Sequence, residues 1–286
     1  MDLSVIIVNF NTKKLTEQAA LAVLKTTKRS SLEVIIADNS TDKTQLLDKS
    51  KNKSVTVFIT ANKGFGNACN LAAERAEGDF LLFLNSDTVV YQNTIDDCLD
   101  FIKRHKGVGV VGARVLLKDG SLDHGCKRGF PTPISALFYF LKLHRLFPGN
   151  KYFGGYTKSY VNNNSVCEVD SVSGAFLIIR TELFRRLNGF DERFFMYGED
   201  LDLCLRVKKS GEKVVYYGKA KLLHLKGQSG LHTKPESVIR HFYNSMLIFY
   251  NKHYKKKYGK ITALIVTSAI KLKYLLTVLF HRIKPR

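Results

Sequence analysis

Cysteine and proline are scarce in this chain, and neither forms a pattern. Five prolines, 20 glycines and a hydrophobic content of 45% are ordinary for a globular α/β protein, and they exclude a disordered or repetitive chain. The cysteines are odd in number, scattered and without Cys-x-x-Cys spacing, so neither a disulfide framework nor a zinc site is predicted. They are Cys69, Cys98, Cys126, Cys167 and Cys204.

Two familiar segments are missing near the start of the chain. No basic stretch followed by an apolar stretch and a cleavage site is present, because Met1-Asp2 leads directly into an apolar run over 3–8. We therefore expect a cytoplasmic protein. The Gly-x-Gly-x-x-Gly turn is also absent, since Asn9-Phe10-Asn11 stands at the first strand-to-helix junction. A nicotinamide or flavin dehydrogenase is thereby disfavoured.

Acidic residues are nearly absent from the C-terminal end. From residue 206 onward there are nineteen Lys and Arg but only Glu212 and Glu236, so this end holds +17 of the net charge of +20. A basic region of this kind suits nucleic acid or an anionic membrane surface. The charge alone leaves both partners open.

Apolar runs alternate with amphipathic segments through the first 113 residues. This alternation predicts βαβ units, and therefore a Rossmann-like, mostly parallel sheet with helices on both faces. The predicted strands are 3–8, 34–37, 55–59, 80–84 and 108–112, and the predicted helices are 12–27, one from about Asp42, 65–77 and one before 108.

The pattern loosens between residues 114 and 164, where three of the five prolines lie. We interpret this stretch as a long irregular excursion that forms part of a binding cleft or lid. Order returns with an apolar run at 169–179, a short helix from Thr181 and a longer helix from Glu199.

The run over 80–84 stops abruptly at Asn85-Ser86-Asp87. A continuous apolar run predicts a fully buried parallel strand, and ligands of open α/β sheets bind beyond the carboxyl ends of such strands. A carboxylate at that point can hold a divalent cation, and the cation can hold a diphosphate. An aspartate that only caps the next helix is the alternative.

Three acidic residues, Glu199, Asp200 and Asp202, begin the helix that follows the aromatic stretch 194–198. The helix dipole favours acidic residues in a first turn, which accounts for any one of them. It does not account for the aromatic residues that precede the helix. Apolar surroundings raise the pKa of a carboxylate toward the range in which it can act as a general base at neutral pH.

Six segments together resemble, in order and spacing, a family 2 inverting glycosyltransferase of the GT-A fold. They are SVIIVNFN at 4–11, ADNSTD at 37–42, NKGFGNACN at 62–70, NSD at 85–87, SGA at 173–175 and GEDLD at 198–202. Within that family the chain is most similar to the bacterial dTDP-rhamnose-dependent rhamnosyltransferases of cell-wall and surface polysaccharide synthesis. The resemblance covers residues 3–255.

The resemblance implies a donor site. It assigns Asp38 to the nucleoside, and NSD stands where the family has its Asp-x-Asp metal motif, with Asn85 in place of the first Asp. Only Asp87 therefore supplies a charge there, which lowers the expected strength of metal binding. The side chains implied to bind the donor are Asn9, Asn11, Asp38, Asn62, Lys63, Asn67, Asn85, Ser86 and Asp87.

The resemblance also implies the chemistry. Asp200 matches the carboxylate that deprotonates the acceptor hydroxyl, with Glu199 beside it, which implies inversion in a single displacement. His224 ends a strand-like stretch, and a histidine flanked by leucines is often only packed. In similar enzymes it joins the metal site, where Mg²⁺ or Mn²⁺ held with Asp87 acts as a Lewis acid on the leaving diphosphate.

The last segment, 236–286, combines aromatic residues and cations with an apolar stretch over 261–280. Lys271 and Lys273 near the centre of this stretch are costly in a bilayer core, so an interfacial amphipathic helix is predicted rather than a membrane span. Helices that merely pack on the domain are the alternative. An anionic membrane surface would bring the enzyme to a polyprenyl-diphosphate-linked saccharide acceptor.

We therefore expect a catalytic domain over 1–235, with a donor half at 1–113 and an acceptor half at 114–235, and C-terminal helices over 236–286. The expected reaction moves L-rhamnose from dTDP-rhamnose onto a lipid-linked saccharide at the inner face of the cell membrane. A UDP-hexose transferase of the same fold is the nearest alternative. A nucleic-acid-binding protein leaves the carboxylates at strand and helix ends unexplained, and a catalytically inactive assembly protein is the third possibility.

Overall fold

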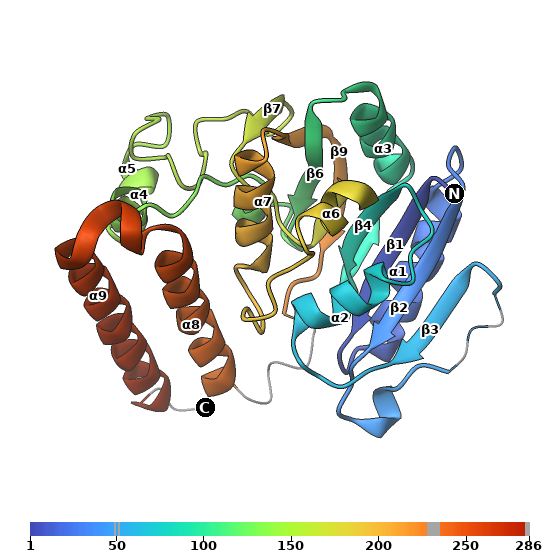
Figure 1. Cartoon of the computed structure of the whole chain (residues 1–286), viewed down its shortest axis with the longest axis horizontal. Helices are drawn as coiled ribbons and strands as arrows, with labels where there is room; N and C mark the ends of the chain where they lie inside the picture. The colour runs from blue at the N-terminus through green and yellow to red at the C-terminus, as the bar shows by residue number, and fades with distance from the viewer. Residues whose placement is uncertain (49, 51, 228–234, 284–286) are drawn as a thin grey trace.

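The computed structural model describes residues 1–48, 50, 52–227 and 235–283. Its centre is a nine-stranded mixed sheet in the order β3-β2-β1-β4-β8-β6-β9-β5, with β7 also paired to β9 (Figure 1). The strands are β1 Leu3–Asn9, β2 Leu32–Asp38, β3 Val55–Ile59, β4 Phe80–Asn85, β5 Thr88–Val90, β6 Val108–Leu116, β7 Val166–Val169, β8 Phe176–Arg180 and β9 Lys213–His224.

The N-terminal half of the sheet confirms the predicted parallel arrangement. β1 pairs in parallel with both β2 and β4, and β2 pairs in parallel with β3. All seven residues of β1 are buried, as expected of a central strand covered on both faces. The second half departs from this pattern, because β8 runs antiparallel to both of its neighbours, β4 and β6.

Helices flank the sheet as expected, with one exception. They are α1 Lys13–Thr26, α2 Phe65–Ala73, α3 Thr94–Arg104, α6 Thr181–Arg186 and α7 Glu199–Lys209. The helix predicted from Asp42 is wrong, since only a single 3₁₀ turn, η1 Lys43–Gln45, forms there. The Leu47 amide donates to Asp38 and the Asn9 side chain donates to the Gln45 carbonyl, so polar side chains hold this segment as a loop.

The excursion after β6 contains more regular structure than the sequence pattern predicts. It holds a 3₁₀ turn, η2 His124–Cys126, and two short helices, α4 Pro133–Phe140 and α5 Leu143–Leu146. Thr132 caps α4 by accepting a hydrogen bond from the Ser135 amide, and Pro133 follows at the first helical position. A Pro at that point favours the start of a helix rather than a loop.

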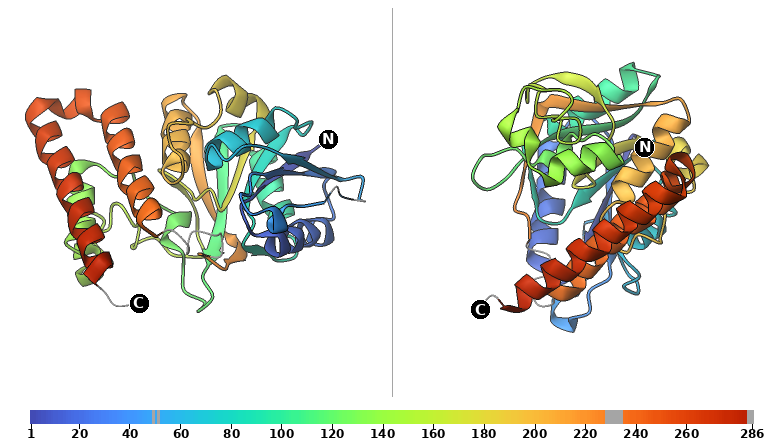
Figure 2. Two further views of the ribbon diagram at one scale, coloured as in Figure 1. Left: turned by 90° about the horizontal axis from the view of Figure 1, so that it is seen from below. Right: turned by 90° about the vertical axis from the view of Figure 1, so that its left-hand side faces the viewer.

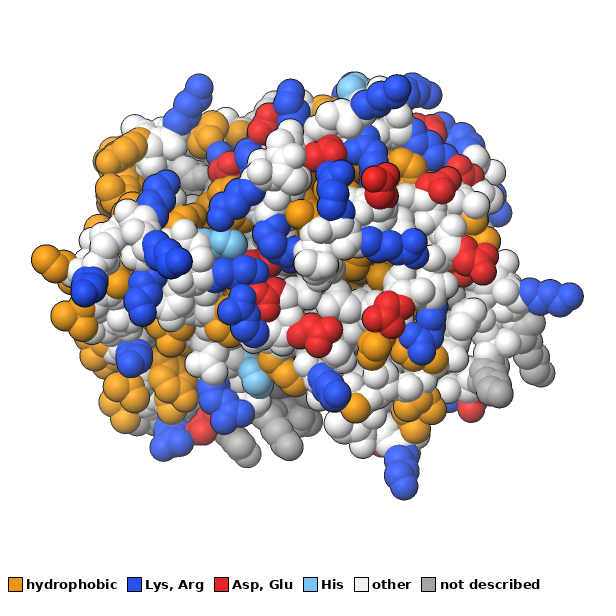
Figure 3. Space-filling view, viewed as in Figure 1, with side chains coloured by type: hydrophobic (Ala, Val, Ile, Leu, Met, Phe, Trp, Pro, Cys, Tyr) orange, Lys and Arg blue, Asp and Glu red, His pale blue; other side chains and the backbone are white. Residues whose placement is uncertain are grey.

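The chain ends in a helical hairpin, α8 Pro235–His253 and α9 Lys255–Ile283, with a bend at Gly259 (Figures 1 and 2). α9 is long and apolar enough to cross a membrane, and little of it is buried in the fold. On the same side of the molecule lie α4 and α5 (Figure 2). Figure 3 shows hydrophobic side chains along the edge where α9 lies, with lysines and arginines among them.

Candidate active site

The parallel strands bring three of the predicted residues to one edge of the sheet. Asn9 ends β1 and is in register with Asp38 at the end of β2, and Val8 is in register with Asn85 at the end of β4. Carboxyl ends of parallel strands meet at one edge, where a ligand of such a sheet binds. The predicted positions of these three residues at strand ends are confirmed. Their contacts with a donor stay a prediction.

Most polar atoms of this edge are engaged in shaping a loop. Asp38 is fully buried, and it accepts from the amides of Ser40 at 3.0 Å and Leu47 at 2.7 Å. The Asn11 side chain accepts from the amides of Thr41 and Asp42, both at 3.0 Å. These bonds fix the backbone over 38–47 as one wall of the predicted nucleoside pocket.

Asn39 is a polar residue of this wall that the sequence did not single out. Its side-chain Nδ2 lies 3.4 Å from the side-chain Oδ1 of Asn62, so it links the loop to the segment before α2. Its own side-chain oxygen is buried and has no hydrogen-bond partner within the described part of the chain. A buried amide oxygen of this kind is suited to accept from a nucleoside base or ribose.

The segment 62–67 contacts the loop that leads into α7. Gly64 has a φ of +106°, and a Cβ at this position would lie 2.4 Å from the Phe195 carbonyl oxygen, so only glycine fits. Asn67 donates to Glu192 at 2.9 Å, and Lys63 is exposed beside them. The three predicted residues Asn62, Lys63 and Asn67 thus lie where the donor half meets the acceptor half.

Asp87 and His224 come together, as the resemblance implied. β5 pairs with the end of β9 so that Thr88 faces His224, and His224 Nε2 lies 3.1 Å from Asp87 Oδ1. Asn85 Nδ2 lies 3.4 Å from the same ring nitrogen. Ser86 turns away and contacts the Thr12 hydroxyl at 3.1 Å. Within the NSD motif, Asp87 and Asn85 therefore reach His224 and Ser86 does not.

Asp123 completes this cluster and was missed by the sequence analysis. Its carboxylate lies 3.3 Å from His224 Nδ1 and 3.3 Å from Lys226 Nζ. Burial alone lowers the pKa of His224, but hydrogen bonds to Asp123 and Asp87 outweigh it and raise that pKa to about 9. An Asp-Gly turn at 119–120, between β6 and Leu122, is the sequence signal that folds Asp123 back onto the site.

The cluster fits a divalent cation held by few protein ligands. Asp87 Oδ1 and His224 Nε2 lie 3.1 Å apart, so both could ligate one cation that displaces the proton between them, and a carboxylate with an imidazole suits Mn²⁺ or Mg²⁺. Asp123 fixes the ring from its other nitrogen, as carboxylates do for metal-bound histidines. Among the residues that the structure describes, no group of three or more acidic, His or Cys side chains forms a closed metal site. The remaining positions would fall to a diphosphate and water.

Asp200 and Glu199, adjacent at the start of α7, have opposite environments. Asp200 Oδ2 accepts from Arg128 at 2.7 Å and from the Gly174 amide at 3.0 Å. Glu199 Oε2 is buried and has no partner among the described residues. Burial, with the nearby charge of Asp200, raises the pKa of Glu199 to about 8. The apolar environment expected around the base therefore acts on Glu199, which is protonated at neutral pH.

Arg128 is the second residue that the sequence analysis missed. It lies in the excursion, where its backbone forms a bridge with Ser171 and its guanidinium reaches Asp200. One short segment then connects both clusters, because the Gly174 amide donates to Asp200 and the Ala175 carbonyl accepts from the Asn85 amide at 3.2 Å. The motif SGA over 173–175 thus places the paired carboxylate next to the NSD motif.

Two solved structures share this architecture. The S. aureus TarS structure of residues 1–349 has a TM-score of 0.55 at 20% identity and covers 88% of this chain and 66% of that chain. A structure of GalNAc-T7 with UDP, GalNAc and Mn²⁺ has a TM-score of 0.60 at 18% identity, covering 96% and 54%. At these identities the likeness concerns the fold, and it confirms the expected GT-A architecture.

The sequence profile described as Glycosyl transferase family 2 matches residues 4–161, more than half of the chain. The chain belongs to this family. A second profile, described as the N-terminal domain of galactosyltransferase, matches residues 159–228. The chain is therefore a glycosyltransferase, and the two profiles together span the donor edge, the Asp87 cluster and Asp200.

Two curated relatives are named as rhamnosyltransferases. An N-acetylglucosaminyl-diphospho-decaprenol L-rhamnosyltransferase of Mycobacterium tuberculosis is 29% identical over 246 residues, which are 82% of this chain and 79% of the relative. The rhamnosyltransferase WbbL of Escherichia coli K12 is 30% identical over 166 residues, 54% of this chain and 57% of the relative.

Proposed function

We propose that this glycosyltransferase moves L-rhamnose from dTDP-rhamnose onto a saccharide linked to a polyprenyl diphosphate. The names of the two rhamnosyltransferase relatives support the sugar, and the name of the mycobacterial relative supports a diphosphate-linked lipid acceptor. The observation that carries the reaction type is the segment 173–175, which joins the Arg128-paired Asp200 to the NSD motif through two backbone hydrogen bonds.

Asp200 is the general base in this proposal. The raised pKa of Glu199 favours its protonated form at neutral pH, whereas Asp200 is a charged carboxylate paired with Arg128. Asp200 is therefore the neighbour that can accept a proton. Asp200 takes the proton of the acceptor hydroxyl as that oxygen attacks the anomeric carbon. The bond from the anomeric carbon to the diphosphate oxygen breaks on the opposite face, and the configuration inverts.

Asp87 and His224 hold the diphosphate side of the site. Mg²⁺ or Mn²⁺ bound there would supply Lewis-acid stabilisation of the leaving diphosphate. The Asn9, Asn11 and Asp38 wall orients the nucleoside. Lys63, which is exposed, would add a cation for the diphosphate.

The C-terminal hairpin places the enzyme at the inner face of the cell membrane in this proposal. α9 exposes a series of large apolar side chains, among them Ile261 at 79%, Leu264 at 68% and Phe280 at 70%. A row of exposed apolar side chains is uncommon on a surface that faces water and is typical of a surface that contacts a membrane. Lys255, Lys256 and Lys260 would face anionic lipid head groups.

A UDP-sugar transferase is the competing assignment, because solved TarS structures hold UDP and UDP-GlcNAc and the second profile carries a galactosyltransferase description. The deciding experiment is a thermal-shift panel of dTDP-rhamnose, dTDP-glucose, UDP-glucose, UDP-galactose and UDP-GlcNAc with Mn²⁺. We expect dTDP-rhamnose to raise the Tm most and to be the donor consumed with a polyprenyl-diphosphate-linked GlcNAc. A larger shift and turnover with a UDP-hexose would reject the rhamnosyl assignment.

A further inference from the structure

A cavity of about 460 Å³ lies apart from the Asp87 cluster. It is open to solvent and is lined by the C-terminal end of α7, the segment leading into α4 and the turn between α8 and α9. Its lysines are Lys209 and Lys257, its histidine is His253, and its hydroxyl groups come from Thr132 and Ser135. Two lysines beside hydroxyl donors form a chemical environment suited to phosphate oxygens.

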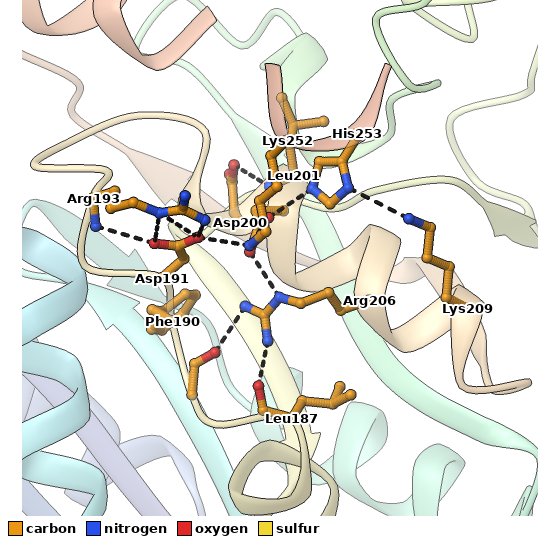
Figure 4. Close-up of polar contacts among 12 residues, drawn as sticks. Leu187, Phe190, Asp191, Arg193, Asp200, Leu201, Arg206, Lys209, Lys252 and His253 are labelled. Carbon is orange, nitrogen blue, oxygen red and sulfur yellow. Dashed lines mark hydrogen bonds and ion pairs between the residues drawn. The ribbon is translucent and has the colours of Figure 1, made fainter. Parts of the chain in front are cut away.

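Lys209 is held in the cavity by a chain of contacts that starts at a buried carboxylate. Asp202, whose side chain is fully buried, lies 2.7 Å from His253 Nε2. The other ring nitrogen, Nδ1, lies 3.5 Å from Lys209 Nζ (Figure 4). Because a carboxylate only accepts, Nε2 donates to Asp202, and Nδ1 is the ring atom that faces Lys209. His253 therefore orients Lys209.

The charge of the cavity is positive. Asp170 is its acidic lining residue, and Lys158 and Lys208 pair with it, each at 3.2 Å. Lys209 and Lys257 have no acidic partner among the residues that the structure describes. An anion entering the cavity would thus meet two uncompensated ammonium groups.

The cavity lies between the membrane-facing helices and the catalytic base. Lys257 belongs to the first turn of α9, and Lys209 is nine residues after Asp200 on α7, which corresponds to about 13 Å along a helix. Phe130, which also lines the cavity, follows Arg128, the partner of Asp200, by two residues. A diphosphate in the cavity joined to a sugar can therefore extend toward Asp200.

We propose that this cavity binds the diphosphate of the lipid-linked acceptor, with Lys209 and Lys257 as its cations and His253 as the residue that positions Lys209. The inference rests on the proposed function for the identity of the acceptor. It adds the place where that acceptor's phosphates bind, distinct from the donor diphosphate near Asp87.

Direct binding of farnesyl diphosphate, measured by calorimetry on the full chain in detergent, tests the site. The double variant Lys209→Ala/Lys257→Ala should weaken binding by at least about tenfold, because a charge-assisted hydrogen bond contributes about 1.5–3 kcal/mol. Farnesol and dTDP-rhamnose should bind the variant and the parent equally. All four lysines are exposed, so the matched control is Lys255→Ala/Lys256→Ala, which removes two lysines that do not line the cavity and should leave farnesyl diphosphate affinity in detergent unchanged.

Several outcomes would overturn the proposal. They are an equal loss in the control pair, no loss in the cavity pair, or tighter binding of phosphatidylglycerol or inorganic diphosphate than of farnesyl diphosphate. His253→Gln keeps a donor and an acceptor and should retain affinity, whereas His253→Leu should lose it while dTDP-rhamnose still binds, which shows that the catalytic domain remains folded. If rhamnosyl transfer is absent while the binding pattern holds, the proposed function fails and the cavity assignment stands. If the double variant Lys209→Ala/Lys257→Ala transfers rhamnose with an unchanged KM for the acceptor, the cavity assignment fails and the proposed function stands.

Discussion

The proposed donor side and the proposed acceptor side of the site are built in different ways. On the donor side, Asn9, Asn11 and Asp38 hydrogen-bond within a stretch of fewer than forty residues, so a strand end and its loop support each other. On the acceptor side, Asp200 depends on Arg128, 72 positions away in the excursion. Asp202 in the same helical turn depends on Lys252 of α8 at 2.6 Å.

This difference predicts unequal sensitivity to distant changes. The donor wall should persist when the C-terminal helices or the excursion are altered, because its partners are local. The acceptor side should respond, because Figure 4 shows α8 joined to the beginning of α7 by Lys252 and His253. Four variants test whether the two sides respond differently. They change Asp200, Glu199, the Asp87 cluster and the C-terminal hairpin.

The largest effect is expected from Asp200→Asn. The amide keeps the shape but cannot accept the proton, and positioned proton transfer contributes about 10²–10⁴ in rate. We expect kcat to fall by that factor in a transfer assay, with donor Kd unchanged in calorimetry because the donor wall is independent. Near-normal turnover of Asp200→Asn would remove Asp200 from the role of base.

Asp87→Ala should rank second and act on the donor side. Loss of the carboxylate leaves Asp123 as the acidic partner of His224 and would leave the donor diphosphate without the proposed cation. We expect the response of activity to added Mn²⁺ or Mg²⁺ to disappear and donor affinity to fall about tenfold or more, with a milder loss in His224→Ala. Full wild-type activity in excess EDTA would show that no divalent cation is needed.

The sequence predicted the proposed donor side better than the proposed acceptor side. The parallel strands and Asp38, Asn85 and Asp87 were predictable, because buried apolar runs end in polar residues at a known edge. The loop at 43–47 was not, since side-chain hydrogen bonds from Asn9 and Asp38 override a helical pattern.

The acceptor side was predicted less well. Asp200 stood out by its motif, but Arg128 and Asp123 lie in the irregular stretch, and only the tertiary fold brings them to Asp200 and His224. The antiparallel β8 was also unforeseen, because an apolar run does not show the direction in which a strand enters the sheet. Contacts between residues far apart in the chain produce no periodic pattern in the local sequence.

Removal of residues 260–286 should have an intermediate effect that depends on the acceptor. α8 is fixed to the catalytic domain by Lys252 and His253, whereas α9 contacts mainly α8 and, through Lys273, the ring of Phe140. The truncated protein should stay folded and bind the donor, but lose most sedimentation with anionic liposomes and most activity on lipid-linked acceptor. Unfolding on truncation, with no liposome binding by the intact chain, would make α9 part of the core.

The smallest effect is expected from Glu199→Gln, and it concerns pH. Burial and the charge of Asp200 raise the pKa of Glu199 from 4.5 to about 8, so the folded protein keeps a proton that the unfolded chain releases. This contribution to stability is complete below pH 4.5 and is lost as pH rises through 8. Glutamine mimics the protonated form, so the variant should match wild-type activity at pH 7.

The same variant should melt higher than the wild type at pH 9, and the difference should vanish near pH 4.5. A gain of a few degrees is expected, because about 1 kcal/mol corresponds to 2–4 °C in a protein of roughly this size. Parallel thermal melts of both proteins across this pH range give the comparison. A loss of kcat as large as that of Asp200→Asn, with no pH-dependent difference in Tm, would move the role of base from Asp200 to Glu199 and reverse the division between the two neighbours.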